Sequence, residues 1–325
     1  MIAVASDLAA DRYGVAHAAI DRAIRTLPRG RNCPSDRAIT WRPRDGEPLW
    51  MRRGRVTYEV WSRDEDGIGF RRVVAVFDDT VSQSRADASA AALWRAGFDG
   101  RHGLAVPEAL GVVPLLGARL QGEIDGRPLD RIEAEEAVVA ASRAGVWLAT
   151  LHRRDLGGPT RVVADTRASL ERARSILTRC AASHRARVDN VIERLHGGLT
   201  PHRPGSPTHG AFGPSKVYVG SAITVDDLGG FALGEPERDL GSFLAEGLVS
   251  ALSGSAALPD IAARNAAFLT GYGHAGGRGS LGRLGLWSSV SLIERLAVLA
   301  EESPLPNRHW DGWLAMCERG LSQAA

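Results

Sequence analysis

The chain has 325 residues, of which 44% are hydrophobic and 24% are charged, and its formal net charge is +2. This length fits one large domain or two lobes with a sizeable core, and the near-neutral charge argues against a general nucleic-acid-binding protein. The sequence shows no run of about 18 apolar residues and no signal peptide, so we expect a cytoplasmic protein with neither membrane nor nucleic-acid partners.

Cysteine and lysine are both scarce in this chain. The cysteines, Cys33, Cys180 and Cys317, lie far apart and indicate neither a disulfide framework nor a zinc site. Lys216 is the single lysine among 40 basic residues, so the remaining 39 (40 − 1) are arginines. This bias, together with the high alanine and glycine content, is typical of a GC-rich bacterial genome, and it makes the position of the lone lysine informative.

The first part of the chain predicts one helix and then strands. Spaced apolar residues indicate an amphipathic helix near the N-terminus, and β-branched and aromatic runs on either side of a charged turn indicate an antiparallel hairpin. An alanine-rich stretch then predicts a second helix. The expected elements are a helix over 5–27, a hairpin with strands 56–62 and 71–79, a helix over 84–98 and strand material over 107–120.

The second part is predicted to be mostly helical, with two short strands. Taken together, the order predicts an α+β fold of two lobes, a small β-rich one followed by a larger helical one. The expected helical regions are 132–152, 166–196 and 238–325, and the strands are 217–219 and 223–225. The expected segments are an N-terminal extension over 1–35, the small lobe over 36–124 and the large lobe over 125–325.

The segment 208–245 carries the most specific pattern in the chain. It reads as a loop, two short strands ending in acids, and a second loop that opens a helix. Its marked positions are His209-Gly210, Lys216, Asp226-Asp227, Gly234-Glu235-Pro236 and Asp239-Leu240. This pattern resembles the aminoglycoside phosphotransferase and choline kinase-like family of protein-kinase-fold enzymes. In that family an H-G-D-x-x-x-x-N loop precedes a strand that ends in a metal-binding Asp, and a G-D-P-x-x-D-L segment follows.

The resemblance extends over about residues 38–320. WLATLH (147–152) looks like the helix end that precedes the catalytic loop, LQGEIDGRPL (120–129) looks like the hinge between the lobes, and AAFLTGY (266–272) resembles a helix of the large lobe. The combination in this order implies the two-lobe kinase-like fold.

Three positions depart from the family pattern. The base that accepts the substrate proton is replaced by Ala211, the metal-binding asparagine by Lys216, and the phosphate-gripping lysine of the third strand by Ala75 in the best register. Loss of a general base alone commonly lowers the rate by roughly 10²–10⁴. Phosphoryl transfer also depends on charge neutralisation, so we do not expect efficient catalysis by the family mechanism.

The resemblance also implies roles for the remaining site residues. Asp227 takes the metal-binding position, with neighbouring Asp226 leaving the register open by one residue, and Gln121 at the hinge joins Lys216 and Asp227 as nucleotide or phosphate contacts. ATP is the implied cofactor. A fixed ammonium beside Asp227 disfavours Mg²⁺, so we hypothesise that Lys216 replaces the metal, either sealing the site or holding a phosphate. His209 and Asp239 are expected to brace the loop.

Each of these residues also has a plain structural reading. Lys216 can be a solvated side chain and Asp227 a turn acid, while Asp87, without a lysine opposite, is expected to be a surface charge. Trp310 and Trp313 are expected in the core rather than in a cleft. MRRGRV (51–56) is the only candidate for a loop over a nucleotide, and its arginines, Arg52, Arg53 and Arg55, suit a solvated face, a phosphate or an acidic peptide.

Two function classes follow. The first is a pseudokinase that binds or scaffolds a peptide or partner enzyme in a bacterial biosynthetic pathway. The alternative is an active ATP-dependent phosphotransferase acting on a small-molecule or peptide hydroxyl with a rearranged site, in which Asp226 serves as the base. A ligand-sequestering resistance or storage protein is a third reading.

Overall fold

The computed structural model describes residues 15–26, 39–44, 54–64, 67–77, 80–200, 205–252, 254, 257–302 and 307–323. The chain forms two compact units, which are described separately: unit 1 comprises Met1–Asp125 with Thr224–Gly229, and unit 2 comprises Gly126–Ile223 with Gly230–Ala325. Parts of the predicted N-terminal helix, the segment 51–53 of the nucleotide-loop candidate with Arg52 and Arg53, and Cys33 lie outside the described residues.

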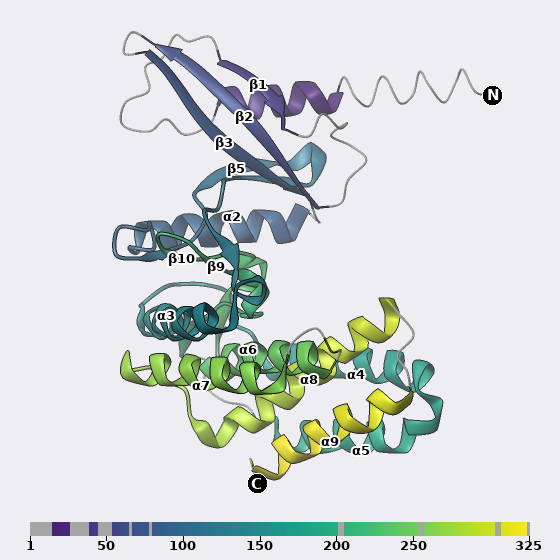
Figure 1. Cartoon of the computed structure of the whole chain (residues 1–325). Helices are drawn as coiled ribbons and strands as arrows, with labels where there is room; N and C mark the ends of the chain where they lie inside the picture. Colours follow the sequence, from purple (N-terminus) through teal and green to yellow (C-terminus); the bar gives the residue numbers. More distant parts are fainter. Residues whose placement is uncertain are drawn as a thin grey trace, which may run out of the picture. The chain divides into compact units, whose positions relative to one another are not determined.

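Unit 1 is built on one antiparallel sheet whose strand order is β1-β2-β3-β6-β5 (Figure 1). The predicted hairpin is confirmed: β2 and β3 pair along their whole length, from Gly54 opposite Phe77 to Asp64 opposite Gly67. The predicted strand material over 107–120 forms two strands joined by a 3-10 turn. The elements are β1 (Ile39–Pro43), β2 (Gly54–Asp64), β3 (Gly67–Phe77), α2 (Thr80–Arg95), β4 (Leu104–Ala105), β5 (Ala109–Val113) and β6 (Ala118–Gly122).

The two faces of this sheet have different surroundings. One face packs against a helix over 15–25, where Ile20 and Ile24 join the apolar side chains of β2, β3 and β6 in a buried cluster. Strand alternation places Arg55, Val76 and Arg119 on the other face, because these three residues lie side by side on neighbouring strands. The sheet therefore separates an apolar core from a face that carries charge.

Unit 2 is mostly helical, as the sequence predicts. Two short antiparallel strand pairs, β7 with β9 and β8 with β11, accompany the helices. Among the described residues, no helix is both long and apolar enough to span a lipid bilayer. The helices are α3 (Ala134–Arg153), α4 (Val163–Cys180), α5 (Arg185–Gly198), α6 (Pro236–Leu252), α7 (Leu258–His274), α8 (Leu281–Glu302) and α9 (Asn307–Gln323), and the strands are β7 (Arg127–Pro128), β8 (Ser206–Thr208), β9 (Val217–Val219), β10 (Ile223–Val225, at the division of the units) and β11 (Ala232–Gly234).

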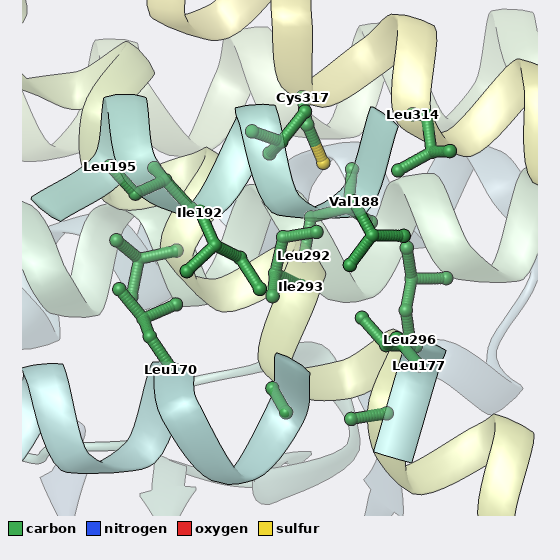
Figure 2. Packing of buried hydrophobic residues seen from close by; sticks show 14 of the residues in the cluster. Leu170, Leu177, Val188, Ile192, Leu195, Leu292, Ile293, Leu296, Leu314 and Cys317 are labelled. Carbon is green, nitrogen blue, oxygen red and sulfur yellow. The ribbon is translucent and has the colours of Figure 1, made fainter. Parts of the chain in front are cut away.

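The predicted helical region over 166–196 is two helices rather than one. The chain leaves the helix at Ala181 and makes a 3-10 turn over Ala182–His184 before α5 begins. Both helices direct their apolar stripes into one core with α8 and α9, which a single straight helix could not do (Figure 2). Trp310 and Trp313 belong to this core and are 1% and 0% exposed, so the expectation of core packing is confirmed.

Helices α3 and α7 pack in close backbone contact at two glycines. A Cβ atom on Gly145 would lie 2.2 Å from the carbonyl oxygen of Phe268, and one on Gly271 would lie 2.1 Å from that of Ser142. Neither position can accept a side chain without separating the helices.

Replacing Gly145 by alanine is expected to lower the free energy of unfolding by at least about 1–3 kcal/mol, because the added methyl group meets backbone. The matched control is Gly273→Ala in α7, where a Cβ would meet no atom within 4 Å. That variant should gain roughly 0.5–1 kcal/mol from helix propensity. Urea denaturation of the two variants tests the contact, and equal stabilities would contradict it.

Candidate functional site

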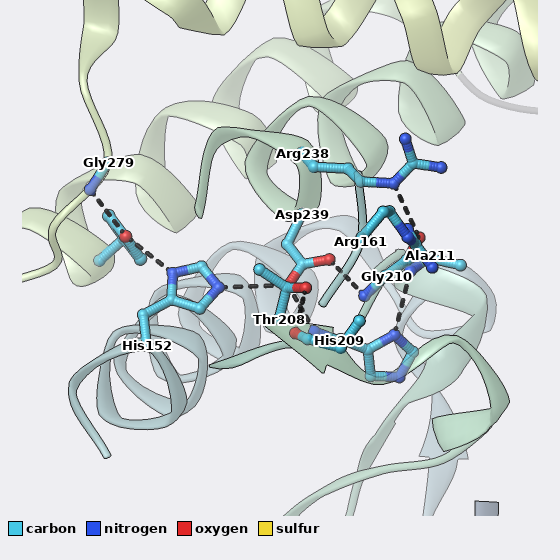
Figure 3. A network of polar contacts seen from close by, with 11 residues as sticks. His152, Arg161, Thr208, His209, Gly210, Ala211, Arg238, Asp239 and Gly279 are labelled. Atoms are coloured by element: carbon cyan, nitrogen blue, oxygen red, sulfur yellow. Dashed lines mark hydrogen bonds and ion pairs between the residues drawn. The ribbon is translucent and has the colours of Figure 1, made fainter. Parts of the chain in front are cut away.

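The loop that follows β8 is held by one buried carboxylate. Asp239, which is fully buried, accepts hydrogen bonds from the backbone N–H groups of His209 (2.6 Å) and Gly210 (2.7 Å) and contacts Nε2 of His152 at 3.1 Å (Figure 3). Burial alone would raise the pKa of Asp239, but these donors and the nearby His209 outweigh it, so the pKa lies below its ordinary value. The ionised carboxylate of Asp239 therefore fixes the backbone of this loop.

A chain of polar contacts continues from Asp239 away from the loop. His152 Nδ1 lies 2.9 Å from the hydroxyl of Tyr272, which also accepts a hydrogen bond from the N–H of Gly279 at 3.0 Å. Because His152 donates to Asp239 through Nε2, its Nδ1 is free to accept from the Tyr272 hydroxyl. Burial raises the pKa of Tyr272 to about 12, so this hydroxyl keeps its proton. Each polar group in this series of contacts has a hydrogen-bond partner, so the series has a structural role.

Two arginines also bind the backbone of the loop. Gly210 has a φ of 92°, and a Cβ there would meet the carbonyl oxygen of Gly230 at 2.2 Å, so this position requires glycine. The Gly210 carbonyl accepts from Arg161 Nη1 (3.3 Å) and Arg238 Nε (3.4 Å), and Arg161 also donates to the Gly230 carbonyl at 2.9 Å. His209 accepts from the Ala211 N–H through Nδ1 at 3.3 Å and thus braces the same turn.

Ala211 and Lys216 line a pocket of about 380 Å³ within unit 2. Ala211 is exposed and presents only a methyl group to it, whereas Lys216 ends a 3-10 turn and is half-buried. Glu246 fixes this turn, because one of its carboxylate oxygens accepts from the Ser215 N–H at 2.6 Å and the other pairs with Arg295 at 2.6 Å. The charged side chains that line the pocket are Lys216, Arg238, Glu294 and Arg295.

The two acids after β10 differ completely in their surroundings in unit 1. Asp226 is 0% exposed and pairs with Arg55 of β2 and with Arg119 of β6, the latter at 3.3 Å. Burial would raise the pKa of Asp226, but the two guanidinium groups outweigh it and lower the pKa. Asp227 is exposed, and among the described residues it is the single non-glycine residue with a positive φ, at 66°. Asp227 therefore lies at the surface, whereas Asp226 is enclosed by its arginine partners.

Ala75, the expected phosphate-gripping position, lies on the apolar face of the sheet. Its neighbours across the sheet are Val56 and Leu120, and it is buried in the apolar cluster that packs on the helix over 15–25. Val76, one residue on, shares the face of Arg55 and Arg119. The cations on that face come from β2 and β6, the strands next to β3.

Gln121 and Asp87 also lie in unit 1. Gln121 is fully buried on the same face as Arg119, and neither polar atom of its amide finds a hydrogen-bond partner among the described residues. Asp87 is not the free surface charge that we expected: it accepts a hydrogen bond from the Gly111 N–H at 3.1 Å, and burial raises its pKa. It anchors α2 to the bulge of β5.

Several charged residues described above, one in unit 1 and the others in unit 2, escape prediction from the sequence. Their common feature is that they are arginines or their partners, brought in from helices and strands distant in the chain. In a chain with 39 arginines, no spacing distinguishes the few that are buried. Arg238 alone carries a signal, since it directly precedes Asp239. The residues are Arg119, Arg161, Arg238, Glu246, Glu294 and Arg295.

Comparison with known proteins places this architecture in the kinase-like class. No family model and no curated protein sequence matches the chain. Solved structures do match. A choline/ethanolamine kinase family protein from Mesorhizobium loti aligns with a TM-score of 0.55 at 17% identity, over 82% of this chain and 88% of that one.

Two further structures give the same result. An aminoglycoside-3'-phosphotransferase of type VIII aligns with a TM-score of 0.54 at 19% identity, over 85% of this chain and 99% of its own. The amicoumacin kinase hAmiN, solved with AMP-PNP and Ca²⁺, aligns with a TM-score of 0.52 at 12% identity, over 84% of this chain and 86% of its own. The chain therefore has the α+β kinase-like fold of the choline kinase and aminoglycoside phosphotransferase structures.

Proposed function

We propose that this protein is a pseudokinase, a kinase-fold protein that binds a peptide or partner enzyme and does not transfer phosphate by the family mechanism. The observation that carries the proposal is the contrast at the loop after β8. Asp239, Arg161 and Arg238 hold this loop in a fully hydrogen-bonded frame, yet the frame presents the methyl group of Ala211 where the family pattern has its base. A frame that is complete without its reactive group suits a binding role.

The donor atoms present fit the organic part of a nucleotide better than they fit Mg²⁺. The amide of Gln121 offers an unpaired donor and an unpaired acceptor, and Arg119 Nη1 is also without a partner among the described residues. Of the two metal-binding positions in the family pattern, only Asp227 carries an oxygen donor, because the ammonium of Lys216 cannot bind a cation. ATP, if bound, would meet Gln121 and the arginines of unit 1.

The alternative, an active phosphotransferase with a rearranged site, needs a replacement base. Asp226 is the candidate named by the sequence, but it is fully buried and pairs with Arg55 and Arg119. Its lowered pKa makes it a weak proton acceptor at neutral pH. These contacts favour the pseudokinase over the enzyme.

The first experiment is a calorimetric titration of the full chain with ATP and ADP, with and without Mg²⁺, on the wild type and on Lys216→Asn. We expect nucleotide binding that does not require Mg²⁺ and that weakens about tenfold in the variant, because Lys216 supplies the positive charge that a metal would otherwise bring. Binding that depends on Mg²⁺ would contradict this role. No binding at all would restrict the protein to peptide or protein partners.

The assay that separates the two function classes is ATP turnover. Phosphate release should stay at the level of a protein-free blank in the wild type and also in Ala211→Asp, because the lysine and the asparagine of the family pattern are still missing. Turnover above the blank in the wild type would identify an active phosphotransferase.

A further inference from the structure

The departures at Ala211 and Lys216 change the charge of the pocket in the same direction. Relative to the family pattern, alanine in place of aspartate raises the formal charge by one unit, and lysine in place of asparagine raises it by another. Both residues line the same pocket of about 380 Å³. Loss of catalysis alone does not predict that both substitutions change the charge in the same direction. A change in the charge of the ligand does predict this.

Three of the four charged side chains that line this pocket are cations. Lys216, Arg238 and Arg295 line it together with a single carboxylate, that of Glu294. Arg295 pairs with Glu246 at 2.6 Å. Ser242 and Ser291 add hydroxyl groups, and side chains such as Val298 provide apolar wall.

Arg238 is held in position but is only weakly bonded. Its contacts with the Gly210 carbonyl (3.4 Å), the Thr166 hydroxyl (3.3 Å) and Glu294 (3.5 Å) are all longer than a good N–H···O bond. The ring of Trp287 lies 5.4 Å from its guanidinium carbon and fixes its direction. An anion can therefore replace weak bonds of Arg238 with short, charge-assisted ones.

A second guanidinium reinforces the positive charge. Arg161 and Arg238 both reach the Gly210 carbonyl and both line an adjoining cavity of about 320 Å³. The pKa of Arg161 is lowered by burial and by the neighbouring charge of Arg238, which reflects how close the two cations lie. The carboxylate that shares this cavity, Glu235, is already taken up by Arg283 (2.8 Å) and by the indole N–H of Trp287 (2.9 Å).

We infer that the pocket at Ala211 binds an anionic group, a carboxylate or a phosphate, and excludes cationic ligands. The inference rests on the proposed binding function, because it names the chemical class of ligand for that same site. Its chemistry is recognition by Lys216, Arg238 and Arg295, with the methyl group of Ala211 removing the repulsion that an aspartate would impose on the ligand.

The test is calorimetry at low ionic strength with three capped dipeptides that differ in charge: N-acetyl-Glu-Glu-amide, N-acetyl-Gln-Gln-amide and N-acetyl-Lys-Lys-amide. The acidic peptide should bind at least about tenfold more tightly than the neutral one, the basic peptide should bind most weakly, and added salt should weaken the acidic complex. Inorganic phosphate serves as competitor. Displacement identifies a phosphate-bearing ligand and its absence a carboxylate ligand, and either result supports the anion site.

Variants place the binding in this pocket. Ala211→Asp should weaken the acidic peptide about tenfold, while Ala211→Asn, which has the same size without the charge, should not. Lys216→Asn should weaken it to a similar extent. Arg179→Gln is the matched control, since Arg179 lies in the same unit with 64% of its side chain exposed and does not line the pocket.

The inference is overturned if the neutral or basic peptide binds as tightly as the acidic one, if neither the acidic peptide nor phosphate binds at millimolar concentration, or if Ala211→Asp and Ala211→Asn behave alike. No ATP is present in these titrations. A failure here is thus distinguishable from a failure of the proposed function, which ATP turnover decides.

Discussion

Replacing Asp239 by alanine is expected to lower the free energy of unfolding by about 3–5 kcal/mol. The carboxylate accepts from two buried backbone N–H groups and from His152, and alanine would leave all three donors unsatisfied. Asp239→Asn should lose roughly half as much, because its amide keeps one acceptor oxygen. Asp260→Ala, at an exposed position of α7, should stay within about 0.5 kcal/mol of the wild type. If Asp239→Ala lowered the free energy of unfolding as little as the control does, Asp239 would not be what fixes the loop.

The same carboxylate makes stability depend on pH. The pKa of Asp239 is lower in the folded protein than in the unfolded chain, where it lies near about 3.9. Its contribution is therefore complete above the unfolded pKa and is lost as the pH falls through the folded one. Between pH 7 and acid, the midpoint of thermal unfolding should fall less steeply for Asp239→Asn than for the wild type. Parallel profiles would contradict the lowered pKa of Asp239.

The second large effect is expected at Asp226. Alanine at this position leaves the guanidinium of Arg119, only 3% exposed, as a buried charge without its carboxylate, which typically costs about 3–5 kcal/mol. The double variant Asp226→Leu/Arg119→Met should recover most of that loss, because an apolar pair of similar volume replaces the buried ions. In a double-mutant cycle, urea denaturation of this double variant and of its two component single variants gives the coupling free energy between Asp226 and Arg119.

The pair of Arg179 and Glu301 is the matched surface control for this cycle. Their side chains are 64% and 61% exposed and lie 3.5 Å apart, so their coupling should be at most about 1 kcal/mol. A coupling at Asp226 and Arg119 no larger than this would mean that the cluster does not hold unit 1 together.

The elements governed by local pattern are predictable from the sequence, and those governed by distant packing are not. The β2–β3 hairpin follows from alternating β-branched and aromatic residues around a charged turn. The break between α4 and α5 does not, because Ala181 and Ala182 are good helix formers and the turn is imposed by the core with α8 and α9.

The site shows the same division. Motif positions such as His209, Ala211 and Asp239 are found from their spacing, and the structure brings them into one loop frame. The face of Ala75 cannot be deduced, since every residue of VVAVF is apolar and either register looks equally buried. The arginine partners of Asp226 are 171 and 107 positions away in the chain, which no local pattern links.

That separation has a consequence for how the molecule is made. Unit 1 includes the six residues Thr224–Gly229, although the chain on both sides of this segment belongs to unit 2. During synthesis, Arg55 and Arg119 leave the ribosome long before Asp226, so the amino-terminal unit stays incomplete until two thirds of the chain exists. A fragment cut at Asp125 would lack the carboxylate altogether. We therefore expect that unit 1 cannot fold as an independent domain. Its buried ion pairs are completed only by Asp226, which comes from a later part of the polypeptide.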